Sequence, residues 1–198
     1  MSSPEIPVVP PHPKTPIYTL MIDEACFDLP IHPVAPGLSI AVLNLLGDTR
    51  LTDIAARALA VRLAKVEFDS LLTAETKSIP LIHELARLTI RPYAVLRKHY
   101  RTYMGQALSY TTRSITTGQT QTLHLDERDL RHIRDRRVLI VDDVISTGST
   151  LHAMKSLVVE AGGTVAGTAA ICTEGDDPQQ WKNEVIALAH LPLFRDLD

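Results

Sequence analysis

The segment from Val138 to Thr150 constrains the fold of this chain more than any other stretch. It opens with four apolar residues, Val138–Val141, which run without the alternation of a half-exposed strand. Such a run is typical of a strand that is buried on both faces of a parallel sheet. Two acids, Asp142 and Asp143, stand where this strand is expected to end, and a short loop of small hydroxylated residues follows. The segment therefore predicts a buried strand that leads through a tight polar loop into the next element.

The next element is a helix, because apolar residues recur after the loop at helical spacing, with Ser149 or Thr150 as the expected N-cap. Free N–H groups and the positive end of the helix dipole bind anions, and Gly148 would let a phosphate approach the backbone. Two carboxylates would repel a bare phosphate, so we expect them to meet sugar hydroxyls or a cation. The pattern thus predicts a sugar-phosphate site. The alternative is a buried strand that ends in acids and binds nothing.

These thirteen residues resemble the phosphoribosyl-pyrophosphate (PRPP) motif of type I phosphoribosyltransferases: a strand, two acids, two variable residues and a Thr-Gly-x-Thr type loop. A response-regulator receiver domain also has a strand that ends in two acids, but there the pair closes the first strand. The resemblance spans roughly residues 28–173 and implies that Asp142 and Asp143 are catalytic. It also implies that PRPP is bound by the residues that follow them, namely Val144, Ile145, Ser146, Thr147, Gly148, Ser149 and Thr150.

A second strand–loop–helix unit precedes this one. Residues 68–73 predict a strand and residues 79–88 a helix, with Pro80 suited to its first turn. The loop between them, Glu75, Thr76 and Lys77, resembles the pyrophosphate loop of adenine and xanthine phosphoribosyltransferases, which implies that it binds PRPP. Lys77 stands where arginine is frequent in that family, and it offers a point charge in place of a bidentate fork.

A third strand, predicted over residues 92–96, ends in Arg97 and Lys98. This pair resembles the Arg-Lys strand end of the same enzymes, followed by a mobile lid that reaches Gly105. The resemblance implies that Arg97 and Lys98 are catalytic and that Tyr103 contacts PRPP. Adenine-type enzymes usually carry an acid after the lid glycine, where this chain has Gln106. Residues 107–112 and 121–125 alternate enough for a hairpin with its turn near residues 116–118.

The remaining pattern gives the fold class. Strands that alternate with helices indicate an α/β, doubly wound, mostly parallel sheet, in which ligands bind at the carboxyl ends of the strands. Further strands are expected over residues 17–22, 164–173 and 185–189, and a helix from Thr52 or Asp53. Prolines in residues 28–41 favour irregular or edge structure. We expect a proline-rich tail over residues 1–16 and one domain over 17–198, with a small hood (about 17–48), a core (about 49–198) and a flexible lid or hairpin.

Composition narrows the partners and the compartment. A net charge of −3 and a pI of about 6.2 give no basic surface for nucleic acid or membrane. No apolar run approaches a membrane span, and the first residues do not form a secretory signal. Cys26 and Cys172 are far apart in the sequence, which favours reduced thiols in the cytoplasm. The family resemblance implies a homodimer.

The chemistry that the motifs allow is transfer of ribose 5-phosphate from PRPP to a purine base, with release of pyrophosphate. Mg²⁺ is expected to arrive with PRPP; no residue is predicted to be a direct ligand, although Asp142 or Asp143 could hold the ion through water. The overall pattern is most similar to adenine-type enzymes, which favours adenine, while hypoxanthine, guanine and xanthine stay open. The rival class is a non-catalytic PRPP-binding regulator or sensor.

Overall fold

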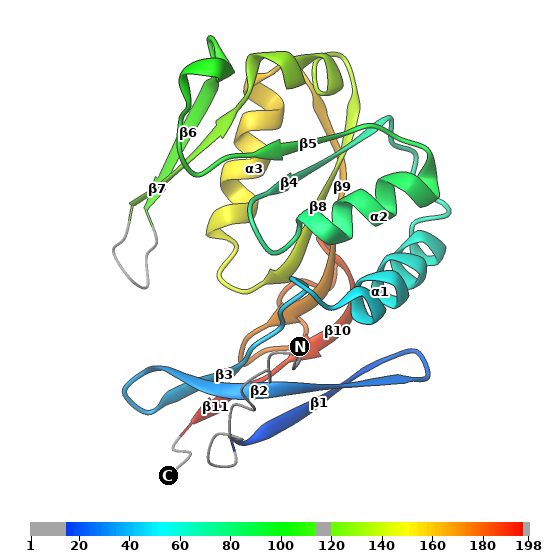
Figure 1. The fold of residues 1–198 in the computed structure, drawn as a ribbon, viewed down its shortest axis with the longest axis vertical. Helices are drawn as coiled ribbons and strands as arrows, with labels where there is room; N and C mark the ends of the chain where they lie inside the picture. The colour runs from blue at the N-terminus through cyan, green and yellow to red at the C-terminus, as the bar shows by residue number, and fades with distance from the viewer. Residues whose placement is uncertain (1–14, 114–119, 196–198) are drawn as a thin grey trace, which may run out of the picture.

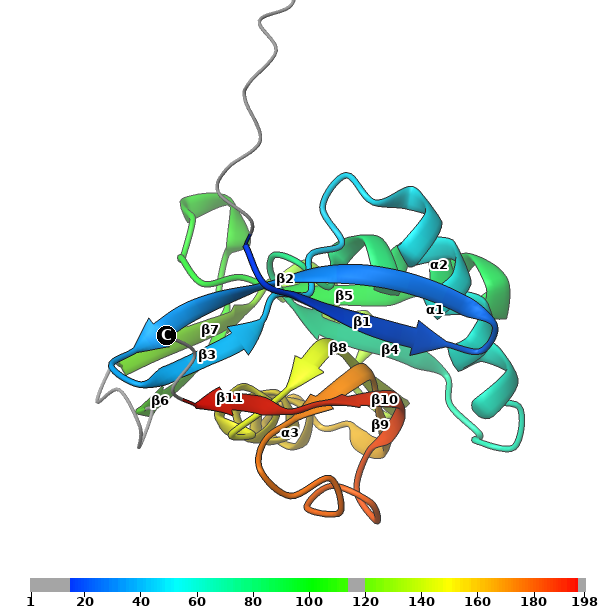
Figure 2. The ribbon, with the colours of Figure 1, turned by 90° about the horizontal axis from the view of Figure 1, so that it is seen from below.

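The computed structural model describes residues 15–113 and 120–195 of the 198. Most of the predicted proline-rich tail and the predicted hairpin turn at residues 116–118 lie outside the described residues. Within them the chain forms a five-stranded sheet, a four-stranded sheet and a two-stranded hairpin (Figures 1 and 2). The hairpin strands, β6 (Leu108–Arg113) and β7 (Thr120–Leu125), pair antiparallel as the sequence predicts.

The five-stranded sheet is parallel throughout and has the order β10-β9-β8-β4-β5. Its strands are β4 (Ser70–Ala74), β5 (Tyr93–Leu96), β8 (Arg137–Ile145), β9 (Thr164–Glu174) and β10 (Ile186–Leu191). The chain starts at β4, adds β5 on one side, and then crosses to add β8 on the other. The strand order therefore reverses between β4 and β8, which is where sheets of this kind bind their ligands.

Helices cover both faces of this sheet, as expected for a doubly wound fold (Figure 1). They are α1 (Thr49–Arg62), α2 (Ile79–Thr89) and α3 (Ser149–Glu160). Alternate residues of β8 serve the two layers: Leu139 and Val141 pack in the cluster that contains α1 and α2, whereas Val138 and Ile140 pack in the cluster that contains α3. All four of these side chains are fully buried, which confirms the prediction from their uninterrupted apolar run.

The four-stranded sheet has the order β1-β2-β3-β11 and lies below the parallel sheet in Figure 1. It is built from β1 (Ile17–Ile22), β2 (Ala25–Ala35), β3 (Leu38–Ala41) and β11 (Leu193–Arg195). The sequence predicts β1 but not β11, which follows β10 and pairs antiparallel with β3 through Leu193 and Ile40. This sheet therefore takes strands from both ends of the chain.

The expectation of irregular or edge structure over residues 28–41 was wrong. Residues in this range form most of β2, which lies between β1 and β3, and the whole of β3. The Pro30 carbonyl accepts a hydrogen bond from the N–H of Val42, one residue past the end of β3. Pro30 pairs with Ile17, the first residue of β1, so Pro33 lies past the start of β1 and has no residue of that strand opposite it. Neither proline therefore removes a hydrogen bond within the ladders, which is where proline is tolerated in a strand.

Helix α1 begins earlier than the predicted Thr52 or Asp53. Its N-cap is Asp48, whose carboxylate accepts a hydrogen bond from the N–H of Leu51 at 2.9 Å. An aspartate at this position satisfies an N–H of the first turn that the helix itself cannot. The other predicted elements agree with the structure within a few residues, including α2 with Pro80 in its first turn.

Candidate active site

The loop between β8 and α3 forms a small hollow at the carboxyl edge of the parallel sheet. β8 continues through both acids to Ile145, and α3 takes Gly148 as its N-cap in place of the predicted Ser149 or Thr150. Gly148 has a φ of +79°, a conformation that glycine adopts at little cost. A partly open cavity of about 110 Å³ lies here, lined by Asp142 and residues 144–151. The predicted phosphate-loop residues Val144 to Thr150 therefore share one hollow at the N-terminus of a helix.

Trp181, from the segment between β9 and β10, supports this loop from outside. Its indole Nε1–H donates to the carbonyl of Ser146 at 3.1 Å. A Cβ atom added to Gly148 would lie 2.5 Å from the indole ring, so only glycine fits against it. The sequence analysis missed Trp181, because nothing in the chain links position 181 to a loop that precedes it by more than thirty residues.

The two acids differ in burial. Asp142 is 9% exposed, and burial, followed by repulsion from Asp143, raises its pKa to about 8. Asp143 is half-buried and lines the larger cavity described below. Within the described residues neither carboxylate forms an ion pair with a lysine or arginine. Burial therefore favours the neutral form of Asp142, and no lysine or arginine of the described residues compensates the acid pair.

The β4–α2 loop, which includes Glu75, Thr76 and Lys77, lies beside the acids. The Lys77 ammonium donates to the carbonyl of Leu43 at 3.2 Å, and that residue precedes α1. Glu75 accepts a hydrogen bond from the backbone N–H of Lys98 at 2.6 Å and forms an ion pair with Arg97 at 2.7 Å. The ends of β4 and β5 are thus joined through one carboxylate.

These strand ends enclose a cavity of about 470 Å³ between β4 and β8. It is lined by Leu46, Ala74, Glu75, Thr76, Lys77, Ser78, Lys98, Gln121, Asp142, Asp143, Val144 and Thr150. It shares Asp142, Val144 and Thr150 with the smaller cavity, so the two are adjacent. The sequence analysis did not assign Leu46, Ser78 or Gln121 to the site. Gln121, in β7, reaches it because the β6–β7 hairpin packs against α3 and the end of β5.

Two residues that the resemblance placed in the site do not line either of these cavities in the described structure. The guanidinium of Arg97 is held by Glu75, and Arg97 and Tyr103 both line a separate hollow beside β5. Tyr103 belongs to the single turn η1 (Thr102–Met104), is 61% exposed, and lies 5.7 Å below the guanidinium of Arg128. The catalytic role of Arg97 and the contact of Tyr103 with PRPP stay predictions.

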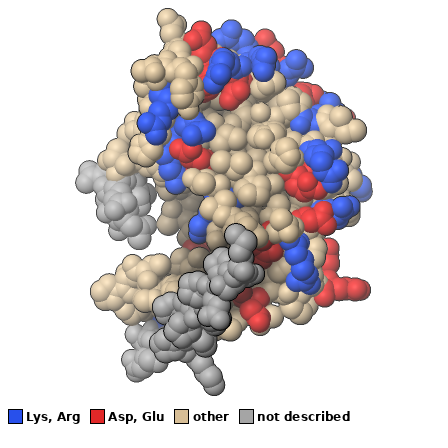
Figure 3. Space-filling view, viewed as in Figure 1, with Lys and Arg blue, Asp and Glu red and all other residues tan. Residues whose placement is uncertain are grey.

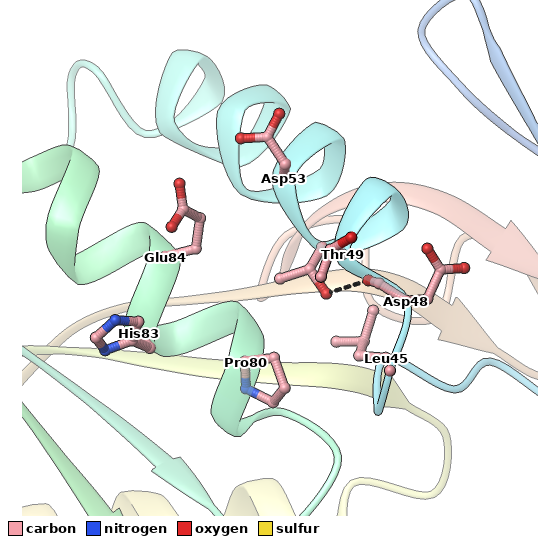
Figure 4. Close-up of a pocket in the computed structure, with 9 residues that line it drawn as sticks. Leu45, Asp48, Thr49, Asp53, Pro80, His83 and Glu84 are labelled. Atoms are coloured by element: carbon pink, nitrogen blue, oxygen red, sulfur yellow. Dashed lines mark hydrogen bonds between the residues drawn. The ribbon is translucent and has the colours of Figure 1, made fainter. Parts of the chain in front are cut away.

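A further cavity of about 440 Å³ lies between the first turns of α1 and α2 (Figure 4). Its acids are already engaged: Asp48 caps α1, Asp53 pairs with Arg57, and Glu84 pairs with Arg87. On the face shown in Figure 3, lysines and arginines are interspersed with acids over the parallel-sheet region. The uncompensated acids and the phosphate-type loop are therefore found at the β4–β8 edge and not in this cavity.

A parallel α/β sheet with a helix N-terminus, a glycine loop and two acids at its switch point defines a class of enzymes that bind sugar phosphates or nucleotides. Comparison with known families assigns the chain within that class. The model of the phosphoribosyl transferase domain matches residues 46–190. The chain therefore belongs to the phosphoribosyltransferase family and is a transferase.

Individual relatives agree with this assignment. The chain is 31% identical to a hypoxanthine/guanine phosphoribosyltransferase of Methanotorris igneus over 150 residues, which cover 74% of this chain and 73% of that protein. It is 28% identical to the purine biosynthesis transcriptional repressor PurR of Bacillus subtilis, over 73% of this chain and 50% of the repressor. The fold is similar to that of adenine phosphoribosyltransferase from Thermoanaerobacter pseudethanolicus, with a TM-score of 0.66 at 22% identity over 82% of this chain and 95% of that one.

Proposed function

We propose that the protein is a purine phosphoribosyltransferase, which transfers the 5-phosphoribosyl group of PRPP to a ring nitrogen of a purine and releases pyrophosphate. The observation that carries this proposal is the cavity between β4 and β8. It brings the acids at the end of β8, the β4–α2 loop with Lys77, and Lys98 to the same side of the sheet. PRPP has a matching pattern of groups: a ribose between two phosphate-bearing ends.

The smaller cavity suits the 5-phosphate of PRPP. It lies at the N-terminus of α3, where unpaired N–H groups and the helix dipole favour an anion. Hydroxyls of Ser146, Thr147 and Thr150 add donors around it. The acid pair lies in β8 just before this loop, at a position suited to the ribose. We therefore assign Asp142 and Asp143 to the ribose, where the negative charge of the more exposed Asp143 stabilises positive charge that develops at C1.

Lys77 and Lys98 suit the pyrophosphate. Neither ammonium forms an ion pair with a carboxylate in the part of the chain that the structure describes, and both line the larger cavity. The present partner of Lys77 is a neutral carbonyl, which an anionic oxygen could replace. Two cations on this side would stabilise the negative charge that the leaving pyrophosphate takes with it. Arg97 could join them only by leaving Glu75.

The donor set of the cavity fits Mg²⁺ that is bound largely by its substrate. Among the described residues no group of three or more histidines, cysteines and acids is positioned to hold a metal by itself. Mg²⁺ prefers phosphate oxygens and water and commonly uses one or two carboxylates. Asp142 or Asp143, which line the cavity, would hold it through water. When bound, the ion would neutralise pyrophosphate charge.

The reaction breaks the bond between C1 of the ribose and the pyrophosphate oxygen, and forms a bond from C1 to a nitrogen of the base. The electron pair of the broken bond leaves with pyrophosphate, and the base nitrogen loses its proton. Positive charge therefore passes through C1, next to the acids. Exclusion of water protects the activated sugar from hydrolysis, and residues 99–106 and the β6–β7 hairpin are the proposed lid.

The purine would lie beside Leu46 and Val144, the two apolar side chains at the larger cavity that can pack against a flat ring. Leu46 is 48% exposed, which leaves its surface free for a ligand. Adenine is our first candidate, from the overall sequence pattern and the adenine-type fold. Hypoxanthine and guanine are the second, because a relative with 31% identity carries that name.

Pyrophosphate release in the presence of Mg²⁺, PRPP and each of adenine, hypoxanthine, guanine and xanthine tests the proposal. We expect turnover with at least one base and none without a base. A protein that binds PRPP tightly but turns over no base would instead be a regulator, as the name of the repressor relative indicates for that protein. Omission of Mg²⁺ should abolish turnover.

We further propose a homodimer and a cytoplasmic location. Both cysteines are free thiols, Cys26 exposed and Cys172 buried, as is usual where thiols stay reduced. In the described part of the chain, no helix has the length and apolar character needed to span a membrane. Light scattering of the purified protein tests the dimer, since a monomeric mass would contradict it.

A further inference from the structure

Ser78 occupies a capping position but does not act as a cap. It precedes α2 as its N-cap residue, yet its side chain makes no hydrogen bond to the first turn of that helix. Serine is common at this position because its hydroxyl normally accepts a hydrogen bond from a backbone N–H of the first turn. The Ser78 hydroxyl points away from α2 and toward β8. Its identity therefore needs another explanation.

The contacts of this hydroxyl supply one. The Ser78 Oγ lies 2.7 Å from Oδ1 of Asp142 and 3.0 Å from Oδ1 of Asp143, and it accepts a hydrogen bond from the backbone N–H of Asp143 at 3.0 Å. Ser78 is only 2% exposed, so water does not substitute for these bonds. One hydroxyl thus joins the start of α2 to both acids across the switch point.

We propose that Ser78 is a positioning residue for phosphoribosyl transfer, which holds Asp142 and Asp143 in the orientation that meets the ribose. This inference rests on the proposed function and deepens it. Ser78 directly follows Lys77, which we assign to the pyrophosphate. The bond that breaks joins the ribose to the pyrophosphate, so its two sides are held by segments that Ser78 connects. A small displacement between them would misplace the acids at the moment when charge develops at C1.

Ser70 provides a matched control. It lies at the opposite end of β4, is fully buried, and its hydroxyl also forms a hydrogen bond between elements, to the carbonyl of His132. The same loss of a buried hydroxyl can therefore be made at the start of β4 and, past its other end, at the N-cap of α2. Only the change at Ser78 lies beside the acids.

The experiment compares Ser78→Ala, Ser78→Thr and Ser70→Ala in steady-state transfer with the accepted purine. We expect Ser78→Ala to lower kcat about 10- to 100-fold while the KM for PRPP changes by less than about three-fold, because the lost hydrogen bond orients groups that act in the transition state. Ser78→Thr, which keeps the hydroxyl, should recover most of kcat. Ser70→Ala should lower the melting temperature but keep kcat within about two-fold.

A second measurement does not depend on turnover. In amide NMR spectra, Ser78→Ala should shift the Asp143 N–H resonance, because this N–H shares its hydrogen bond between Ser78 Oγ and Asp142 Oδ1 and would keep only the second acceptor, and Ser70→Ala should leave it in place. If Ser78→Ala does not fold, Ser78→Cys against Ser70→Cys carries the same comparison with a weaker donor. Wild-type kcat in folded Ser78→Ala, an equal loss in Ser70→Ala, or an unmoved Asp143 amide would overturn the inference. Wild-type protein that turns over no purine overturns the proposed function instead, and the amide comparison still decides whether Ser78 holds Asp143.

Discussion

The two ends of the β4–β8 pair carry similar residues in opposite electrostatic states. At the amino end, Asp69 accepts hydrogen bonds from the backbone and the guanidinium of Arg137, and this pairing holds the pKa of Asp69 well below its usual range. At the carboxyl end, Asp142 is buried beside Asp143, and its pKa is raised to about 8. The same type of side chain is therefore stabilised as an anion at one edge and destabilised at the other.

The difference teaches what each edge is for. At the amino edge Asp69 is paired within the chain with Arg137, which also pairs with Glu67. These pairs hold the starts of the two strands together. At the carboxyl edge the acids and the ammonium groups of Lys77 and Lys98 line one cavity without pairing with one another. Charges that have no partner within the fold can act on a bound molecule. For this reason, side chains with perturbed pKa values are frequent in active sites.

The strongest test of this contrast exchanges one acid at each edge. Asp143→Asn should lower kcat roughly 10²- to 10³-fold, because it removes charge next to C1, and should leave the melting temperature nearly unchanged. Asp69→Asn should do the reverse and lower the melting temperature while kcat stays within about two-fold. Steady-state kinetics and thermal melts of both variants measure this. Full activity of Asp143→Asn would refute its assignment to the ribose.

The next test uses the glycines at the two ends of α3. Gly148→Ala places a methyl group 2.5 Å from the ring of Trp181 and forces a φ of +79° on alanine. We expect it to raise the KM for PRPP about ten-fold or more through distortion of the phosphate loop. Gly162→Ala has a similar φ of +82° but meets nothing closer than 3.7 Å. It should cost stability alone, so an equal rise in KM there would contradict the argument.

The raised pKa of Asp142 predicts how stability changes with pH. Between about pH 4 and about pH 8, folded Asp142 keeps a proton that the unfolded chain has released, so stability falls as the pH rises through this window. Asp142→Asn should remove this loss, and its melting temperature relative to wild type should rise by a few degrees from pH 5 to pH 8.

The amino edge predicts the opposite pH dependence. The pKa of Asp69 is lowered in the folded protein, so its contribution is present above the unfolded pKa and is lost as the pH falls into the acid range. Asp69→Asn should therefore lower the melting temperature near pH 7 and have less effect in acid. Thermal melts of Asp142→Asn and Asp69→Asn across pH measure both trends. Melting-temperature differences from wild type that change with pH in the same direction for the two variants would contradict the contrast between the two edges.

The smallest expected effect concerns the support of the loop. Trp181→Phe keeps an aromatic ring but loses the hydrogen bond to the Ser146 carbonyl, and it should raise the KM for PRPP about three-fold. Tyr110→Phe is its control. The hydroxyl of Tyr110 lies 3.2 Å from Nε2 of His152, which is in α3, the helix that follows the loop, so this variant loses a contact outside the loop itself. Steady-state kinetics at varied PRPP concentration measure the KM of both variants.

Local pattern was enough to predict most of the parallel sheet. The four uninterrupted apolar residues before Asp142 can all be buried only where both faces of their strand are covered. Segments with apolar residues at helical spacing predict the helices that cover them. The motif from Val138 to Thr150 was enough to indicate the family. The strand ends at Lys77 and Lys98 were placed on one edge because parallel strands direct their carboxyl ends the same way.

Long-range contacts accounted for what was missed. Strand β11 is three residues long and is stabilised by pairing with β3, more than 150 residues earlier, so no local signal marks it. Prolines suggested irregular structure over residues 28–41, but their missing N–H groups fall where the neighbouring strands have ended. A strand is decided by its partners as much as by its residues.

The sequence by itself determined the individual strands and helices of the parallel sheet, the glycine loop and the pair of acids, because each depends on neighbours within about ten residues. Only the tertiary structure decided how the site is assembled. It put Trp181 behind Gly148, brought Gln121 to the cavity, and turned the Ser78 hydroxyl toward the acids. It also placed Arg97 on Glu75. The orientation and charge state of a side chain depend on what packs against it, and in this protein those neighbours come from distant parts of the chain.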